Sequence, residues 1–200
     1  MTSNLTTLRN LLLLTLALLG GVVTAYILAP RSNPSDQSML QTLGGDFTLQ
    51  GVNGDVSLHD FKGKVVMIYI GYTQCPDVCP TSLAVMSQAM KNMDAKQLKN
   101  IQPLFISVDP ERDTPERLAE YSGFFHPLIL GITGSRENID SVVRQYGAFY
   151  RMVDMEGSAM GYAVDHSSRT YLINKQGELS KTMAHGTMPD QLIAELKNLL

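Results

Sequence analysis

Apolar and polar positions between residues 44 and 200 recur with both strand and helix periods, which predicts an α/β domain. One uninterrupted apolar run, residues 65–70, suits a strand buried on both faces, and residues 101–108 have the apolar content of a second buried strand. Shorter runs that suit strands are 47–49 and 56–58, as an N-terminal β-hairpin, and 128–132, 149–153, 170–173 and 179–183. Strands that alternate with helices and end in a hairpin indicate a mixed sheet flanked by helices.

The helices that separate these strands are recognised by their terminal residues. Thr114 can cap a helix whose first position is Pro115, and Ser135 can cap an amphipathic stretch that ends at Gly147. A last amphipathic helix is predicted from about Pro189. These signals place helices on both sides of the short strand candidate at 128–132.

The N-terminal region differs from the rest in hydropathy. Residues 11–29 form an uncharged, mostly apolar run, which is long enough to span a bilayer as a helix. We therefore expect a membrane anchor at 1–30, a polar tether at 31–43 and a folded domain at 44–200. A cleaved signal peptide is the alternative for the first segment. The N-terminus is poor in arginine, which favours a bacterial membrane protein over a mitochondrial precursor.

Composition excludes one class of partner. The formal net charge is −3, charged residues make up 18% of the chain, and basic residues form no cluster. Nucleic-acid binding requires a basic patch or stripe. No nucleic-acid partner is therefore expected.

The two cysteines of the chain, Cys75 and Cys79, lie directly between the apolar run 65–70 and a helical pattern that starts at Pro80. A helix N-terminus favours the thiolate over the thiol. A disulfide between them would close only a small loop and would constrain the unfolded chain little, which argues against a purely structural disulfide. The Cys-x3-Cys spacing is one residue longer than the redox Cys-x2-Cys motif. Two converging thiolates favour Cu(I) or zinc.

A third ligand would have to come from the four histidines. His59, His126 and His185 suit surface or turn positions. His166 lies in a predicted loop that leads directly into the strand 170–173, and such loops carry sites in α/β folds. Asp165 or a backbone carbonyl could orient its imidazole. From local sequence alone, a lone histidine is more often structural, so this assignment stays open here.

Methionines and aspartates near the same segments are weaker candidates. Met152, Met155 and Met160 precede His166, and thioethers can pass Cu(I) along, although methionine also fills loops without a function. Asp77, between the cysteines, is a possible weak ligand or a partner of a ligand.

Asp109 and Asp113 could supply transient oxygen contacts to a metal. Turn formation and helix entry explain them adequately, because they lie in the segment 109–115 that leads to the helix cap Thr114.

Four motifs resemble the SCO/SenC family of copper-binding proteins and occur in the family's order. They are GYTQCPDVCPTSL at 71–83, SVDPERDTP at 107–115, GITG at 131–134 and VDHSSRTYLI at 164–173. The likeness covers about residues 45–200. Several spaced motifs are far more specific than a cysteine pair alone.

The resemblance implies a thioredoxin-like fold that binds copper, as Cu(I) or Cu(II), through Cys75, Cys79 and His166. It implies a metallochaperone that serves the copper-centre subunit of cytochrome c oxidase, with other periplasmic copper chaperones or thiol reductants as further partners. The expected location is the bacterial inner membrane, with the soluble domain in the periplasm.

Two other functions remain open at this point. A thiol-disulfide reductase that keeps partner cysteines reduced would need the cysteine pair but not His166. A peroxidase-like protein would use one thiol to attack peroxide. Thioredoxins carry a cis-proline before the corresponding late strand, whereas this chain has no proline between Gly161 and Ile173 and has His166 there. That replacement favours a metal ligand.

Overall fold

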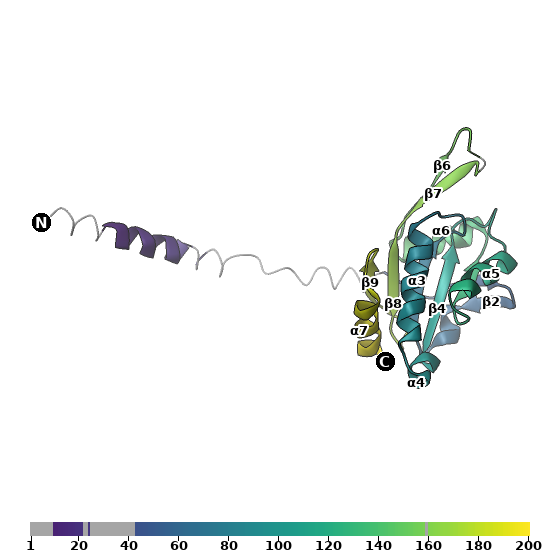
Figure 1. Cartoon of the computed structure of the whole chain (residues 1–200), viewed down its shortest axis with the longest axis horizontal. Coiled ribbons are helices and arrows are strands. Elements are labelled where there is room, and N and C mark those ends of the chain that lie inside the picture. The colour runs from purple at the N-terminus through teal and green to yellow at the C-terminus, as the bar shows by residue number, and fades with distance from the viewer. Residues whose placement is uncertain (1–9, 22–23, 25–42, 159) are drawn as a thin grey trace, which may run out of the picture. The chain divides into compact units, whose positions relative to one another are not determined.

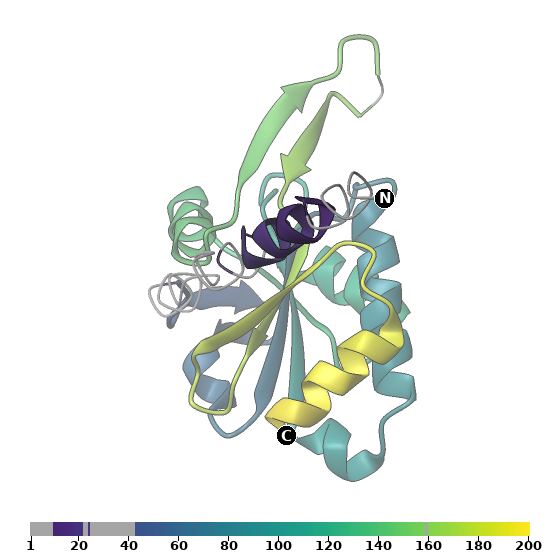
Figure 2. The same cartoon turned by 90° about the vertical axis from the view of Figure 1, so that its left-hand side faces the viewer.

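A central seven-stranded sheet, in the order β2-β1-β5-β4-β3-β8-β9, organises the domain in the computed structural model (Figures 1 and 2). The strands are β1 Thr48–Gly51, β2 Gly54–Ser57, β3 Val65–Gly71, β4 Ile101–Ser107, β5 Leu130–Thr133, β8 Arg169–Ile173 and β9 Leu179–Ala184. β3, β4 and β5 are parallel, whereas β8 and β9 join antiparallel on one side and β1 and β2 on the other. The predicted mixed sheet is therefore confirmed.

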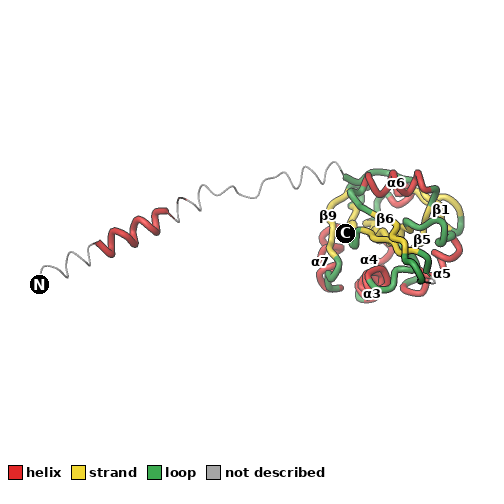
Figure 3. Tube along the Cα trace, turned by 90° about the horizontal axis from the view of Figure 1, so that it is seen from above, coloured by secondary structure: helices red, strands yellow, loops and turns green. Residues whose placement is uncertain are grey.

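Helices cover both faces of this sheet. They are α3 Val78–Lys91, α4 Ala95–Lys99, α5 Pro115–Phe125, α6 Arg136–Gln145 and α7 Pro189–Leu199, with a short 3-10 helix η1 at Leu58–Phe61. Figure 3 shows α3, α5 and α7 on one side of the sheet and α6 on the other. The predicted caps are confirmed, because the side chain of Thr114 accepts a hydrogen bond from the backbone N–H of Arg117, and that of Ser135 from Asn138.

The core is built around β3 and β4, which pair in parallel along their full length. Every residue of both strands is buried. This explains why β3 is a continuous apolar run and why β4 is mostly apolar rather than alternating, with Gln102 and Ser107 as buried polar residues. β3 ends at Gly71, and the cysteine loop starts there, so a fully buried central strand leads into the segment with the two thiols.

A second, two-stranded sheet corrects the sequence analysis. β6 Tyr150–Asp154 and β7 Tyr162–His166 pair antiparallel and project from the domain as a hairpin (Figure 1). The prediction of a loop around His166 was wrong, because residues 162–166 form a strand. Its polar residues and the preceding glycines hid the strand period; pairing with β6 supplies its backbone hydrogen bonds.

The structure describes residues 10–21, 24, 43–158 and 160–200. The chain divides into two units, Met1–Gln37 and Ser38–Leu200. In the first unit, residues 10–21 and 24 are helical, and the leucines described there are exposed. The remainder of the predicted anchor and nearly all of the predicted tether lie outside the described residues. Within the described part of the chain, no helix is long and apolar enough to cross a membrane.

Gly71 is a position where the fold and the cysteines meet. A Cβ atom there would overlap with Sγ of Cys79 and lie 3.2 Å from the ring of Phe105. We expect Gly71→Ala to lower the free energy of unfolding by about 1–3 kcal/mol, because overpacking forces neighbours to shift. Urea unfolding measures the change.

The matched control is Gly123→Ala in α5, where an added Cβ meets nothing within 4 Å. Alanine in a helix is expected to stabilise there by about 0.5–1 kcal/mol. Equal unfolding midpoints for the two variants would contradict the close approach at Gly71.

Candidate metal centre

The two cysteines lie at the junction between β3 and α3. Cys75 is in the connecting loop, and Cys79 is the second residue of α3, just before Pro80. Both thiols are free. Cys75 retains 8% of its accessible surface and Cys79 none. The predicted position at a helix N-terminus is confirmed, with one thiol at the surface of the site and one beneath it.

His166 reaches the cysteines from the end of β7. Its Nε2 atom lies 3.2 Å from Sγ of Cys79, across 87 positions of sequence. The ligand atoms of Cys75, Cys79 and His166 all lie within 4.8 Å of one another. A single ion can therefore contact all three side chains. Among the described residues, no other group of three Cys, His, Asp or Glu side chains has this arrangement.

Backbone and aromatic contacts orient the imidazole of His166. Its Nδ1 lies 3.3 Å from the carbonyl oxygen of Ser167, and a carbonyl can only accept, so Nδ1–H donates. In the neutral ring this leaves the lone pair on Nε2, which faces Cys79. The rings of Tyr69 and Tyr72 pack edge-to-face against the imidazole, with centroids 6.3 and 5.8 Å away.

The carboxylates of the two aspartates proposed as partners of the site do not join the ligand atoms. Asp165 is exposed and forms an ion pair with Arg151 at 2.7 Å, so the carbonyl of Ser167, rather than this carboxylate, orients His166. Asp77 is exposed at the N-cap position of α3, and its nearest side-chain partner is the hydroxyl of Thr81 at 3.4 Å. Neither carboxylate belongs to the group of three ligand atoms.

The other histidines stand outside the cluster of ligand atoms. His59 is exposed in η1, and His126 ends α5, where Nδ1 accepts a hydrogen bond from the backbone N–H of Leu128. His185 is exposed, with Nδ1 3.4 Å from the hydroxyl of Ser82. Met152 and Met155 are partly exposed on the hairpin, and their role as thioether donors stays a prediction.

The environments of the two thiols shift their pKa values in opposite directions. A hydrogen bond from Cys79 lowers the pKa of Cys75 most strongly and backbone N–H groups lower it further, although partial burial opposes them. Burial raises the pKa of Cys79, and the neighbouring Cys75 raises it further. At neutral pH the pair therefore holds one proton, with the thiolate on the more accessible sulfur.

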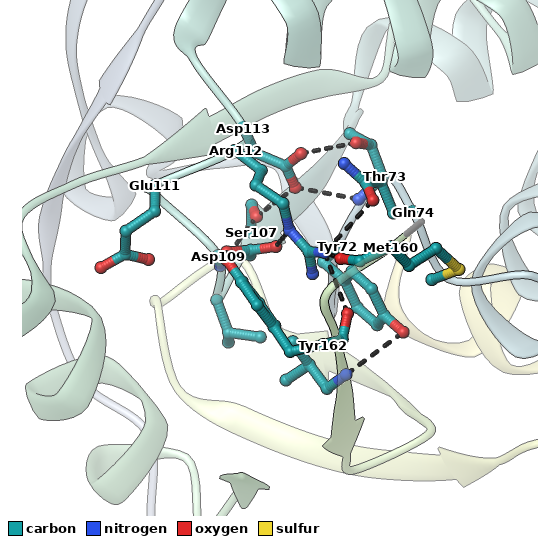
Figure 4. Close-up of polar contacts among 12 residues, drawn as sticks. Tyr72, Thr73, Gln74, Ser107, Asp109, Glu111, Arg112, Asp113, Met160 and Tyr162 are labelled. Atoms are coloured by element: carbon teal, nitrogen blue, oxygen red, sulfur yellow. Dashed lines mark hydrogen bonds and ion pairs between the residues drawn. The ribbon is translucent and has the colours of Figure 1, made fainter. Parts of the chain in front are cut away.

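A buried polar network behind the site was missed by the sequence analysis (Figure 4). The carboxylate of Asp113 accepts hydrogen bonds from the backbone N–H of Thr73 at 2.9 Å, from the hydroxyl of Thr73 at 2.5 Å and from Ser107 at 2.6 Å. It thereby fixes the cysteine loop to the end of β4. Asp113 and Asp109 are fully buried, so their assignment to turn formation alone was incomplete. Their place in the segment between a buried strand and the next helix was the available signal.

A family model described as SCO1/SenC matches residues 35–200. This chain belongs to the SCO1/SenC family. It is 35% identical over 196 residues to an SCO2-like protein of Rickettsia conorii. That match covers 94% of this chain and 95% of the relative. These findings confirm the resemblance inferred from the four motifs.

Solved structures of family members share the fold. Copper-bound ScoI of Bradyrhizobium japonicum superposes with a TM-score of 0.71 at 36% identity, and the match covers 79% of this chain and 99% of that one. BsSco, described with a disulfide switch as a member of the Sco family of cytochrome c oxidase assembly proteins, matches with a TM-score of 0.62 at 26% identity. That match covers 80% of this chain and 94% of BsSco.

The unequal thiols predict selective alkylation. We expect iodoacetamide to modify Cys75 at least about tenfold faster than Cys79 at neutral pH, because one pKa unit is a tenfold change in thiolate population. Mass spectrometry of peptides after timed quenching measures both rates. In urea the two rates should converge; faster labelling of Cys79 in the folded protein would overturn the assignment of the thiolate.

Proposed function

We propose that this protein is a copper metallochaperone that carries a copper ion on Cys75, Cys79 and His166. The observation that carries the proposal is the convergence of these three ligand atoms within 4.8 Å. Copper is here the cargo, so the site must bind it firmly and also release it to a recipient.

The donor set fits copper in both oxidation states. Thiolates are soft ligands that select Cu(I), and an imidazole nitrogen is a good ligand for Cu(II). The free Cys75 already favours the thiolate, and Nε2 of His166 presents its lone pair toward Cys79. Copper-bound structures of relatives from Bradyrhizobium japonicum and Arabidopsis thaliana support the choice of metal.

The positions of the two sulfur atoms indicate the side from which the copper ion is transferred to a recipient. Cys79 is fully buried at the inner side of the site, whereas Cys75 keeps 8% of its accessible surface and His166 is half-buried. A thiolate of the recipient can approach from the side of Cys75 and join the ion before the ligands of this protein depart. Transfer by stepwise ligand exchange needs no covalent bond to the recipient. Oxidation of the two thiols to a disulfide removes both thiolate ligands and would expel the ion.

The recipient that we propose is the copper-centre subunit of cytochrome c oxidase. The support is the family membership and the description of BsSco as belonging to cytochrome c oxidase assembly proteins. The uncharged run at residues 11–29 supports an anchor in the bacterial inner membrane, with the domain in the periplasm. An anchored chaperone would stay close to a membrane-bound oxidase.

A thiol-disulfide reductase is the second candidate, favoured by the unequal thiols. The Cys75 thiolate would attack a disulfide of the partner and form a mixed disulfide, releasing one partner thiolate. Cys79, after losing its proton, would attack Cys75 and release the second partner thiolate, leaving this pair oxidised. A periplasmic dithiol reductant would then have to reduce the pair again. This route does not require His166.

Copper titration of the reduced protein tests the chaperone. We expect one copper per chain and a thiolate-to-Cu(II) absorption band. His166→Ala should weaken Cu(II) binding by about 100-fold or more, because even residues behind a ligand cost 10- to 100-fold. Competition with a chelator of known affinity measures the loss.

The matched control is His59→Ala, which removes an exposed histidine outside the site. It should bind copper like the parent protein. No specific copper binding by the reduced parent would sink the proposal. If His166→Ala also supports oxidase assembly in cells as well as the parent does, the reductase is the better function.

The pH dependence of copper affinity follows from the two thiols. Cys75, with its lowered pKa, is already a thiolate and releases no proton, whereas Cys79, with its raised pKa, must lose one. Affinity for Cu(I) should therefore rise with pH, by about tenfold per unit between about pH 7 and 9. Calorimetry in buffers of different ionisation enthalpy counts the protons. Release of two protons would show that Cys75 is protonated in the free protein.

A further inference from the structure

The β6–β7 hairpin carries His166 but does not belong to the main sheet. β6 and β7 pair only with each other, so no backbone ladder ties them to β3 and the cysteine loop. At its C-terminal end β7 leads through residues 167–168 into β8, which pairs with β3, and this link anchors only one end of the hairpin. Side-chain contacts must hold the rest of β7, and with it the direction of the strand that ends at His166, against the cysteine loop. One contact is the phenol oxygen of Tyr72, which accepts a hydrogen bond from the backbone N–H of Val164 at 3.3 Å.

A larger set of contacts is made by Arg112, in the segment between β4 and α5 (Figure 4). Its Nη1 group donates to the carbonyl oxygens of Met160 at 3.1 Å and Tyr162 at 2.9 Å, both on the hairpin. The same group lies 3.2 Å from the side-chain oxygen of Gln74, which directly precedes Cys75. One guanidinium group thus connects the cysteine loop with the strand that ends at His166.

Nε and the face of the guanidinium make further contacts, whereas Nη2 is buried and makes no hydrogen bond to the described residues. Nε pairs with the fully buried carboxylate of Asp109 at 2.5 Å, and the ring of Tyr162 lies 3.6 Å from the guanidinium carbon. The hydroxyl of Tyr162 donates to the other oxygen of Asp109 at 2.6 Å. Hydrogen bonds of this charge-assisted kind are stronger and more directional than neutral ones. We call Arg112, Asp109, Tyr162, Gln74 and Met160 the Arg112 network.

Tyr162 and His166 are the two ends of the same short strand. Side chains alternate along a strand, so Tyr162, Val164 and His166 lie on one face of β7. The network holds Tyr162 at one end, Tyr72 contacts Val164 in the middle, and His166 meets Cys79 at the other end. A shift of β7 that frees Tyr162 would therefore also move the imidazole.

We infer that Arg112 is a positioning residue: it fixes β7 against the cysteine loop and so sets the distance between His166 and the two thiols. The inference rests on the proposed copper site. Two thiolates suffice for Cu(I), whereas Cu(II) favours an additional nitrogen ligand. Loss of the Arg112 network should consequently weaken Cu(II) binding much more than Cu(I) binding.

The test uses the full chain with Arg112→Met, which keeps the apolar stem, and Arg112→Lys, which keeps the charge. We expect both to weaken Cu(II) binding by about 10- to 100-fold and Cu(I) binding by less than about threefold. Imidazole nitrogen coupling in the Cu(II) electron paramagnetic resonance spectrum should be reduced. Lysine should not restore binding, because a single ammonium cannot span Asp109, Gln74 and two carbonyls.

The control is Arg151→Met, which removes an exposed arginine of the same hairpin. Arg151 pairs with Asp165, the residue directly before His166. This variant changes the net charge by the same amount and should leave both affinities within about twofold, as surface ion pairs contribute little. The double variant Arg112→Met with Asp109→Asn removes the network without leaving an unpaired buried charge. It covers the case in which the single variant does not fold.

Amide hydrogen exchange in the copper-free protein separates this inference from the proposed function. Faster exchange in β6 and β7 of the Arg112 variants, with β3 and β4 unchanged, supports the network even if the parent binds no copper. Unchanged hairpin exchange would overturn it. Equal losses of Cu(I) and Cu(II) affinity, or full rescue by lysine, would also overturn it.

Discussion

Buried carboxylates impose the constraint on which the site depends. Asp109 and Asp113 are fully buried, and a charge in that position is tolerated only when it is paired and hydrogen-bonded. Asp113 meets this requirement with Thr73 and Ser107, and Asp109 meets it with Arg112 and Tyr162. The same contacts join the end of β4 to the cysteine loop and to the hairpin. Satisfying two charges therefore holds together the segments that carry the ligands.

The site combines a rigid part with a separately attached part. Cys79 stands on α3 directly after β3, the central buried strand, and its position follows from the core of the domain. His166 stands on a hairpin outside the main sheet and is oriented by the carbonyl of Ser167 and the rings of Tyr69 and Tyr72. This arrangement suits a copper carrier. Because one ligand lies on α3 and another on the β6–β7 hairpin, the hairpin can move away from the ion without disturbing the core.

The unequal thiols explain how copper binding and thiol exchange can share one pair of cysteines. The Cys75 thiolate, which keeps 8% of its accessible surface beside the fully buried thiol of Cys79, is a suitable ligand for copper and also a suitable nucleophile toward a disulfide. His166 separates the two functions, since only metal binding uses its nitrogen. The oxidation state of Cys75 and Cys79 would then decide whether the proposed chaperone can accept its cargo.

The sequence alone determined the doubly buried strands, the helix caps at Thr114 and Ser135, and the two thiols at a helix N-terminus, because these depend on local composition and spacing. Family motifs added His166, which local sequence left open. Only the tertiary structure decided that residues 162–166 form a strand, that Asp165 pairs with Arg151, and that Arg112 reaches the hairpin. These features depend on contacts between segments that are distant in sequence. The free energy of a buried charge or of an unpaired strand edge depends on its tertiary partners, and a local sequence pattern does not identify those partners.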